Sequence, residues 1–289
     1  MNQLITSNTK LTALLGYPVK QSLSALMHNT AFAYLNLDYI YIPFDIEQED
    51  LQTTVAGLKT LNFTGFNLTM PHKQEIMQYL DEISEEAKLI GAVNTVVKEN
   101  SRLIGYNTDG KGYIASLKEE KIPVKNQKVV MVGAGGAAKS IAIQLAMEGV
   151  EEIFLLNRTI EPAEEIANTI TQNTRGCGVK VQEFNQNNLQ KALKEANILI
   201  NCTPLGMYSM EDRSIIEDES ILRKDLVISD LVYNPAETKL LRQGKNRGCK
   251  TINGLGMLIW QGAFAFKLWT GKDMPVDVVR EKMLGRQVK

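Results

Sequence analysis

The chain has 289 residues, of which 44% are hydrophobic and 22% charged, and its 32 basic and 33 acidic side chains leave a net charge of −1. This composition is typical of a globular protein of about two domains and excludes collagen, coiled coil and disordered tail. The near-neutral charge argues against nucleic acid as a partner, because phosphate binding needs a basic excess.

Features that would place the chain in or beyond a membrane are missing from its sequence. No apolar run approaches the roughly 20 residues that a membrane span needs, and the first ten residues lack the apolar core of a signal peptide. The cysteines Cys177, Cys202 and Cys249 are odd in number and have no metal-ligand spacing. We therefore expect a cytoplasmic protein with reduced thiols, no membrane partner and no metal.

The first part of the chain alternates apolar runs with amphipathic segments, which predicts an α/β domain. A helix is expected to begin at Pro71, with Ile76, Met77 and Leu80 on one face, because proline suits a first helical turn. The predicted strands cover residues 11–16, 39–43, 65–69, 92–98 and 103–107. The other predicted helices cover 24–35, the segment carrying Leu51, Val55 and Leu58, and 110–120.

From Lys128 onward the sequence repeats units of one strand and one helix. Such units predict a doubly wound parallel sheet with right-handed crossovers. Its strands are expected at 128–132, 152–156, 179–182, 198–201, 226–230 and 250–252.

The apolar segment 254–270 is too short for a membrane helix and is expected to form a soluble helix that is buried nearly all round. We expect it to pack back against the first domain, although it could instead form an interface, which leaves a homodimer open. The predicted domains are residues 1–111, 112–252 and the returning segment 253–289, with hinges near Gly110 and Gly254.

A glycine-rich turn follows the strand at 128–132. The run GAGGAAKS places Gly133 at a tight turn, Gly135 where backbone can approach a pyrophosphate, and Ala138 where helix meets strand. The start of the next helix offers free N–H groups and a partial positive charge. This context of strand, turn and helix predicts a dinucleotide site.

The end of the second strand of that unit bears on the choice of cofactor. An NAD enzyme usually has an acidic residue here, whereas this chain has Asn157 and Arg158, and an arginine can pair with a 2′-phosphate. Glu161 could instead favour a free 2′-hydroxyl. The expected cofactor is therefore NADP or NAD, with NADP preferred.

Only two histidines are present. His28, in the middle of a predicted helix, is interpreted as a satisfied packing residue, and His72 as a solvated residue at a helix start. A hydride-transfer enzyme needs a group that exchanges the hydroxyl proton, and Lys73 and Asp109 both lie where a strand ends and a helix begins. A cation in a first helical turn also opposes the macrodipole. The residues alone leave open a surface lysine and a plain helix cap.

Ordered motifs along nearly the whole chain resemble the shikimate dehydrogenase family. They are SLS (22–24), NLTMPHK (67–73), AVNT (92–95), NTDG (107–110), GAGGA (133–137), NRT (157–159), NCTPLGM (201–207), DLVYNP (230–235) and WQGA (260–263). The resemblance implies a substrate domain, a Rossmann domain and reversible NADP-linked oxidation of shikimate to 3-dehydroshikimate, a step of aromatic amino-acid biosynthesis.

The resemblance also assigns roles, with Lys73 and Asp109 as the catalytic pair. It implies that substrate is bound by Ser22, Ser24, Asn67, Thr69, Lys73, Asn94, Asp109, Tyr233 and Gln261. It implies that cofactor is bound by Gly133, Ala134, Gly135, Gly136, Ala137, Asn157, Arg158, Thr159, Thr203, Pro204, Leu205, Met207, Leu231, Gly254 and Met257.

Two departures from the family pattern keep alternatives open. Members that use only NADP commonly carry a second basic residue soon after NRT, where this chain has Ile160, Glu161 and Pro162. The segment 260–275 resembles the quinate/shikimate branch, which accepts NAD. A non-catalytic dinucleotide-binding regulator is the alternative of a different class, and it would have no chemical reason to keep both Lys73 and Asp109.

Overall fold

The computed structural model describes residues 5–61 and 63–287, and its chain divides into two compact units. The first unit holds the residues up to Thr108 together with those from Ile259 onward, and the second is Asp109–Leu258. Residues 1–4, 62 and 288–289 lie outside the described residues, as do the parts of the signal-peptide and domain predictions that fall on them.

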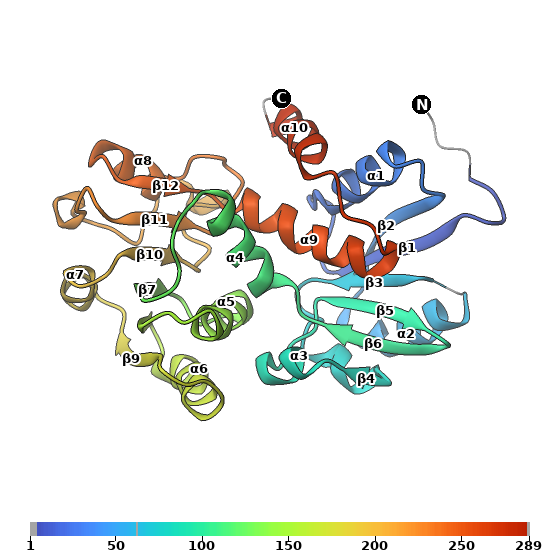
Figure 1. Ribbon diagram of the computed structural model, residues 1–289, viewed down its shortest axis with the longest axis horizontal. Coiled ribbons are helices and arrows are strands. Elements are labelled where there is room, and N and C mark those ends of the chain that lie inside the picture. The colour runs from blue at the N-terminus through green and yellow to red at the C-terminus, as the bar shows by residue number, and fades with distance from the viewer. Residues whose placement is uncertain (1–4, 62, 288–289) are drawn as a thin grey trace. The chain divides into compact units, whose positions relative to one another are not determined.

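The first unit contains a mixed six-stranded sheet in the order β2-β1-β3-β5-β6-β4 (Figure 1). Its strands are β1 (Lys10–Gly16), β2 (Tyr39–Asp45), β3 (Gly65–Leu68), β4 (Glu82–Ile83), β5 (Thr95–Glu99) and β6 (Arg102–Tyr106). Strand β1 runs parallel to β2 and β3, whereas β5 runs antiparallel to β3 and β6. The register pairs Asn67 with Thr95 and Thr95 with Tyr106, so polar strand ends meet.

Helices complete this unit and its core. They are α1 (Ser24–Tyr34), α2 (Leu51–Thr60) and α3 (Glu85–Ile90), with the short 3-10 helices η1 (Gln48–Asp50) and η2 (Glu75–Tyr79). The apolar face of α2 buries Leu51, Val55 and Leu58 against strand residues such as Leu15 and Phe66. The i, i+4, i+7 spacing of those three side chains is the reason that this segment is helical.

The helix predicted to begin at Pro71 is wrong. Residues 70–74 form a turn, and only the 3-10 helix η2 follows. His72 Nε2 lies 2.8 Å from the carbonyl oxygen of Ile46, and the Lys73 carbonyl accepts a hydrogen bond of 2.7 Å from the Val93 N–H. These contacts fix the turn and engage a carbonyl that an α-helix would use internally, so the macrodipole argument for Lys73 fails.

The second unit confirms the predicted doubly wound sheet. Six parallel strands lie in the order β12-β11-β10-β7-β8-β9, which is the Rossmann order. The strands are β7 (Lys128–Val132), β8 (Glu152–Asn157), β9 (Gly178–Glu183), β10 (Ile198–Asn201), β11 (Val227–Asp230) and β12 (Lys250–Ile252). The helices are α4 (Asp109–Glu119), α5 (Gly136–Met147), α6 (Ile160–Asn173), α7 (Gln186–Leu193) and α8 (Lys239–Asn246), with η3 (Tyr208–Met210) and η4 (Glu219–Ile221).

The last two helices are α9 (Leu255–Thr270) and α10 (Val276–Gln287). From Ile259 onward α9 packs on the first unit, as predicted: Trp269 Nε1 donates to the Val96 carbonyl at 3.0 Å, and the Phe266 and Phe32 rings stack at 5.1 Å. Within this helix only Lys267 and Leu268 are exposed, which agrees with the expected burial nearly all round.

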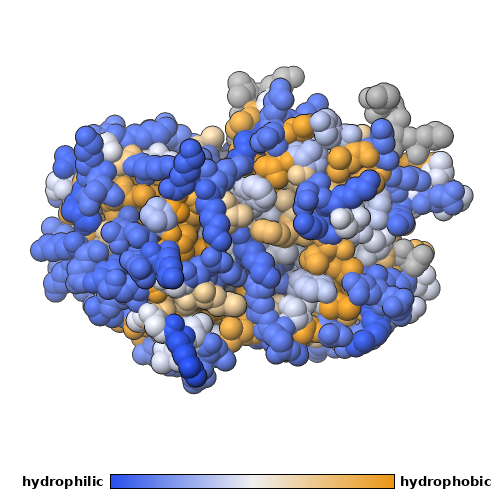
Figure 2. Space-filling view, viewed as in Figure 1, coloured by the Kyte–Doolittle hydropathy of each residue, from blue (hydrophilic) through white to orange (hydrophobic). Residues whose placement is uncertain are grey.

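Hydrophilic side chains cover most of the face shown in Figure 2, with apolar side chains in small groups between them. In the part of the chain that the structure describes, no helix has both the length and the apolar character needed to cross a membrane.

Candidate active site

A buried polar network lies at the strand ends of the first unit. Asn67 belongs to β3, Asn94 precedes β5 and Thr108 follows β6. Asn94 Oδ1 accepts from the Thr108 N–H at 2.9 Å and from the Thr95 hydroxyl at 2.9 Å, while Asn94 Nδ2 donates to Thr108 Oγ1 at 2.9 Å. A buried amide that lacks a hydrogen-bond partner costs free energy, so this mutual bonding fixes each side chain in one orientation.

The side chain of Asn67 is held from three directions. The Tyr41 hydroxyl donates to Asn67 Oδ1 at 2.9 Å, and Asn67 Nδ2 donates to the Asn94 carbonyl and to Thr95 Oγ1, each at 3.0 Å. Both amide hydrogens of Asn67 are thus engaged within the protein. What remains for a ligand is acceptor capacity on Oδ1.

Other predicted substrate-binding residues lie in the same unit. Ser22 Oγ accepts from the Ser24 N–H at 3.2 Å just before α1, which leaves the Ser22 hydroxyl hydrogen to donate outward. Gln261 on α9 lies near the network, since its Oε1 is 3.5 Å from Asn94 Nδ2. Thr69 follows β3, and its carbonyl accepts from the His72 N–H.

The two candidate catalytic residues fall on either side of the unit boundary. Lys73 sits half-buried in the 70–74 turn of the first unit. Asp109 is the first residue of α4 in the second unit, is 6% exposed, and directly follows Thr108 of the polar network. The described contacts locate each residue separately, so their pairing rests on the family resemblance.

Both histidine interpretations need correction. His28 is fully buried and its ring lies against Tyr41 at 4.5 Å and close to Phe266 and Trp269, but among the described residues neither ring nitrogen has a hydrogen-bond partner. Burial lowers the pKa of His28 to about 3, so the ring is neutral. His72 is also fully buried rather than solvated, because its imidazole anchors the turn next to Lys73.

The glycine turn of the second unit fits a dinucleotide pyrophosphate. Gly133 has φ +105°, and a β-carbon there would lie 3.1 Å from the carbonyl of Cys202, so only glycine suits this position. At Gly135 and Gly136 a β-carbon would have no protein atom within 4 Å. Helix α5 begins at Gly136 without a side-chain cap, so its first N–H groups face this open space together with Ala137.

The turn after β8 presents a cation. Asn157 Nδ2 donates to the Thr159 carbonyl at 2.8 Å, which shapes the turn and leaves Arg158 exposed. In the described part of the chain Arg158 forms no ion pair, not even with the nearby exposed Glu161. An unneutralised guanidinium at this strand end suits a 2′-phosphate.

The loop after β10 is held by two buried residues that the sequence reasoning did not assign, Asn201 and Asp230. Asn201 Oδ1 accepts from Thr203 N–H at 3.0 Å and from the Thr203 hydroxyl at 2.7 Å. Asn201 Nδ2 donates to the Leu205 carbonyl at 3.1 Å and to Asp230 Oδ1 at 2.9 Å. Their position at the ends of adjacent strands, directly before two predicted cofactor loops, is the signal that could have found them.

The remaining predicted residues of the second unit lie close to this loop or after β11. Gly254 packs its backbone against the Leu231 carbonyl, where a β-carbon would collide, and its N–H donates to Val232 at 3.1 Å. Tyr233 is half-buried in the segment after β11, and Met257 lies in the first turn of α9. The loop residues Pro204 and Met207 are exposed and half-buried, respectively, and Ala134 in the glycine turn is half-buried.

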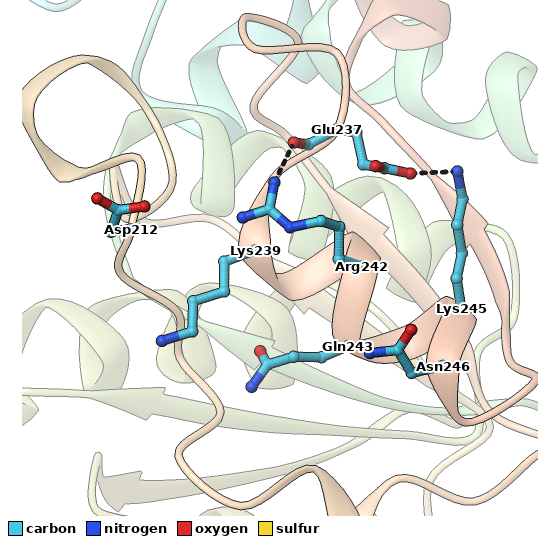
Figure 3. Close-up of a pocket in the computed structure, with 7 residues that line it drawn as sticks. All are labelled: Asp212, Glu237, Lys239, Arg242, Gln243, Lys245 and Asn246. Carbon is cyan, nitrogen blue, oxygen red and sulfur yellow. Dashed lines mark hydrogen bonds and ion pairs between the residues drawn. The ribbon is translucent and has the colours of Figure 1, made fainter.

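A surface hollow of about 570 Å³ lies elsewhere on the second unit, over α8 (Figure 3). It is lined by Asp212, Glu237, Lys239, Arg242, Gln243, Lys245 and Asn246. Two of the cationic side chains in this hollow bind to Glu237: Lys245 forms an ion pair with its carboxylate, and Arg242 donates a hydrogen bond to its backbone carbonyl (Figure 3). None of the predicted site residues lines this hollow.

A Rossmann sheet with an open glycine turn, joined to a unit that carries a rigid polar network and a lysine, defines a dinucleotide-dependent oxidoreductase. Matches to models of protein families identify the family of this oxidoreductase. "Shikimate dehydrogenase substrate binding domain" matches residues 14–96, "Shikimate / quinate 5-dehydrogenase" matches 116–236 and "Shikimate 5'-dehydrogenase C-terminal domain" matches 254–284. The chain belongs to the shikimate dehydrogenase family.

Individual relatives agree with this assignment. The chain is 56% identical to shikimate dehydrogenase (NADP(+)) of Alkaliphilus oremlandii, over 99% of this chain and all of that protein. Its fold matches shikimate 5-dehydrogenase of Listeria monocytogenes, solved with shikimate and NAD, with a TM-score of 0.94 and 41% identity over 98% and 99% of the two chains. The fold also matches quinate dehydrogenase of Corynebacterium glutamicum, solved with NAD, with a TM-score of 0.88 and 31% identity over 96% of this chain and 99% of that chain.

Proposed function

We propose that this protein oxidises shikimate reversibly to 3-dehydroshikimate with NADP as the preferred cofactor, in the biosynthesis of aromatic amino acids. The observation that carries the proposal is the combination of the fixed polar network of the first unit with the open glycine turn of the second. A polyol needs donors and acceptors in fixed directions, and a dinucleotide needs backbone N–H groups around a pyrophosphate.

Lys73 and Asp109 are proposed to carry the proton chemistry. When bound, the nicotinamide cofactor accepts a hydride from the carbon that bears the reacting hydroxyl. The Lys73 amine accepts the proton of that hydroxyl, and the Asp109 carboxylate orients the amine and the hydroxyl. The anchored turn around Lys73 serves this role, because general base catalysis requires a group held within hydrogen-bond reach.

Recognition of substrate is proposed to use two sets of groups. The hydroxyls of Ser22 and Ser24, together with Tyr233, bind the carboxylate, since neutral donors at a helix start can hold an anion without an arginine. The ring hydroxyls are bound by Asn67, Thr69, Asn94, Asp109 and Gln261. A substrate analogue that lacks a hydroxyl would leave these buried groups unpaired and would be rejected.

The predicted domains receive roles on the same basis. Residues 1–111 form the substrate-binding catalytic domain, 112–252 the nucleotide-binding domain, and 253–289 the helical segment that completes the first domain. The observed units, which change at Thr108 and Ile259, support this division. A cytoplasmic location and a homodimer stay predictions.

The preference for NADP rests on Arg158. Its guanidinium is exposed and without an ion pair in the described residues, so it is available for a 2′-phosphate. The cofactor-binding set proposed around it comprises Gly133 to Ala137, Asn157 to Thr159, Thr203 to Leu205, Met207, Leu231, Gly254 and Met257. The similarity to the Alkaliphilus oremlandii shikimate dehydrogenase (NADP(+)) supports the same preference.

A quinate/shikimate dehydrogenase with NAD or dual cofactor use is the second candidate. It is favoured by the segment 260–275, by Glu161 after the NRT motif, and by the 31% identity to a quinate dehydrogenase solved with NAD. A regulator without activity is disfavoured because Lys73 and Asp109 are both present.

Nicotinamide reduction at 340 nm tests the proposal, with shikimate or quinate and NADP or NAD in all four combinations. We expect turnover with shikimate and NADP to exceed each of the other three. Arg158→Ala should raise KM for NADP about tenfold or more and leave KM for NAD within twofold, since a bond to a charged group is lost only with NADP. Faster turnover with quinate or NAD would favour the second candidate, and absence of all four activities would favour the regulator.

A further inference from the structure

Asp230 is a buried carboxylate at the end of β11 that the proposed reaction does not use. It is fully buried, and it accepts three hydrogen bonds: from Asn201 Nδ2 at 2.9 Å and the Val232 N–H at 3.1 Å on Oδ1, and from the Thr238 hydroxyl at 2.7 Å on Oδ2. A buried charge is tolerated only where such bonds replace water.

The three donors come from three different segments. Asn201 ends β10 and holds the loop 203–207 through Thr203 and Leu205. Val232 begins the segment that carries Tyr233. Thr238 caps α8, because its Oγ1 also accepts from the Leu241 N–H at 3.3 Å. Asp230 therefore connects both loops and the start of a helix.

The sheet order indicates which half of the cofactor these loops meet. The pyrophosphate turn follows β7, and the Arg158 turn for the adenosine phosphate follows β8 on one side of it. Strands β10 and β11 lie on the other side, and a β-carbon at Gly133 would touch Cys202 at the start of the 203–207 loop. The nicotinamide half must therefore extend over the loops that Asp230 holds.

Resting on the proposed function, we propose that Asp230 is a positioning residue that holds the 203–207 loop and the Tyr233 segment in the arrangement that binds the nicotinamide half of the cofactor. The carboxylate form makes this arrangement firmly, because hydrogen bonds to an ionised acceptor are stronger than those to a neutral one. Protonation weakens the three bonds and adds a hydrogen on a carboxyl oxygen that competes with the one donated by the Thr238 hydroxyl.

The titration of Asp230 falls in an accessible range. Burial raises the pKa of Asp230 to about 6, against the opposing effect of its three hydrogen bonds. The thiol of Cys202 feels the charge of Asp230, and the hydroxyl of Tyr113 on α4 in turn feels that of Cys202; burial raises the pKa of each well above its usual range. Both stay neutral between pH 5 and 8, so Asp230 is the group that changes charge there.

The experiment compares the dissociation constants of NADP and of 2′,5′-ADP, which lacks the nicotinamide half, for the full chain and its variants. Asp230→Asn keeps the shape but removes the charge, and Thr238→Val removes one donor. We expect each variant to weaken NADP binding about tenfold or more and to change 2′,5′-ADP binding less than twofold, as loss of a bond to a charged group implies. Thr238→Ser, which keeps the hydroxyl, should restore the affinity for NADP.

A matched control separates positioning from general loss of stability. Asn185 caps α7 through a 2.8 Å bond from the Asn188 N–H and, among the described residues, makes no hydrogen bond to Asp230, so Asn185→Ala removes a helix cap alone. It should lower the melting temperature as Thr238→Val does, yet leave the ratio of the two dissociation constants unchanged. An equal change of this ratio in both cap variants would overturn the inference.

The pH dependence of the same ratio gives an independent reading when the unaltered protein is compared with Asp230→Asn, because the phosphates of the two ligands titrate identically in both measurements. As pH falls below about 6, the dissociation constant of NADP relative to that of 2′,5′-ADP should rise more in the unaltered protein than in Asp230→Asn. The same pH dependence of this ratio in both proteins, or equal weakening of both ligands by Asp230→Asn, contradicts the proposal. If the unaltered protein binds neither ligand, the proposed function fails, and the inference with it.

Discussion

The two units differ in the kind of group that each offers to its proposed ligand. In the first unit these groups are buried side chains. Asn67, Asn94 and Thr108 are joined by hydrogen bonds, which fix the positions of their polar atoms at the strand ends. In the second unit they are backbone N–H groups. Gly135 and Gly136 leave open space beside these groups, and no side chain caps the described start of α5.

The difference follows from what each unit is proposed to recognise. Hydroxyl groups donate and accept along definite directions, so they demand side chains that cannot rotate. A pyrophosphate spreads its charge over several oxygens, and peptide N–H groups at a helix start meet it without any side chain. The first unit should therefore respond to loss of side-chain atoms, and the second to added ones.

The largest effect is expected at Lys73. Lys73→Ala should lower kcat about 10²–10⁴-fold with shikimate and NADP, because the proton acceptor is lost while the turn, anchored through His72 and backbone, remains. Steady-state kinetics measure this, and Lys272→Ala, at an exposed lysine of the same unit, is the control. A folded Lys73→Ala enzyme with near-normal kcat would remove Lys73 from the mechanism.

Two alanine substitutions in the glycine turn separate fold from ligand binding. Gly133→Ala forces a side chain into a positive φ and against the Cys202 carbonyl, so the free energy of unfolding should fall by about 1–3 kcal/mol. Gly135→Ala meets no protein atom within 4 Å and should leave the melting temperature unchanged, while its methyl group weakens NADP binding about tenfold. Thermal unfolding and titration with NADP measure both, and a Gly135→Ala protein with unaltered affinity would place the pyrophosphate elsewhere.

Two asparagines sharpen the contrast between the units. Asn94→Ala leaves the buried Thr108 N–H without its acceptor and should lower the free energy of unfolding by about 2–3 kcal/mol. Asn157→Ala loses only exposed bonds, to the Thr159 carbonyl and hydroxyl, and should change the free energy of unfolding by less than about 1 kcal/mol. Denaturant unfolding compares the two, and equal losses would mean that the side-chain network is not what stiffens the first unit.

A smaller, pH-dependent effect is expected from His28. Because its pKa falls from 6.5 to about 3 on folding, the stability it contributes is present above pH 6.5 and is lost as pH falls toward 3. Between pH 7.5 and 5 the loss amounts to about 2 kcal/mol. The unfolding free energy of the unaltered protein should therefore fall relative to that of His28→Phe, which retains the ring stacking, as the pH is lowered from 7.5 to 5. A constant difference would contradict the burial of a neutral imidazole.

The strands were the most predictable part of the fold. Strands β7, β10 and β12 have the bounds expected from the sequence, since short apolar runs next to glycine or proline turns leave few alternatives. The helix at Pro71 failed because its periodicity is local, whereas the bonds from Ile46 and Val93 that fix the turn come from distant parts of the chain.

The candidate site shows the same limit. Glycine turns and strand-end residues such as Lys73 follow from position in the sequence, and motifs extend that list. The orphaned nitrogens of His28, the burial of His72 and the attachment of two loops to Asp230 do not, because each depends on which side chains from remote segments surround the group. Burial and hydrogen bonding are properties of the assembled core.

The interrupted first unit has a consequence for synthesis on the ribosome. All six strands of its sheet are made by Tyr106, but α9, which packs on this unit from Ile259 onward, begins 149 residues later (255 − 106), at Leu255. The Val96 carbonyl receives its hydrogen bond from the indole of Trp269, which lies 173 residues downstream. At the usual rate of translation, synthesis of that length of chain takes roughly 10–35 s. During that time residues 109–258, which contain every strand of the second sheet, emerge in full. The nascent chain therefore carries an uncovered apolar surface for many seconds, a natural target for chaperones.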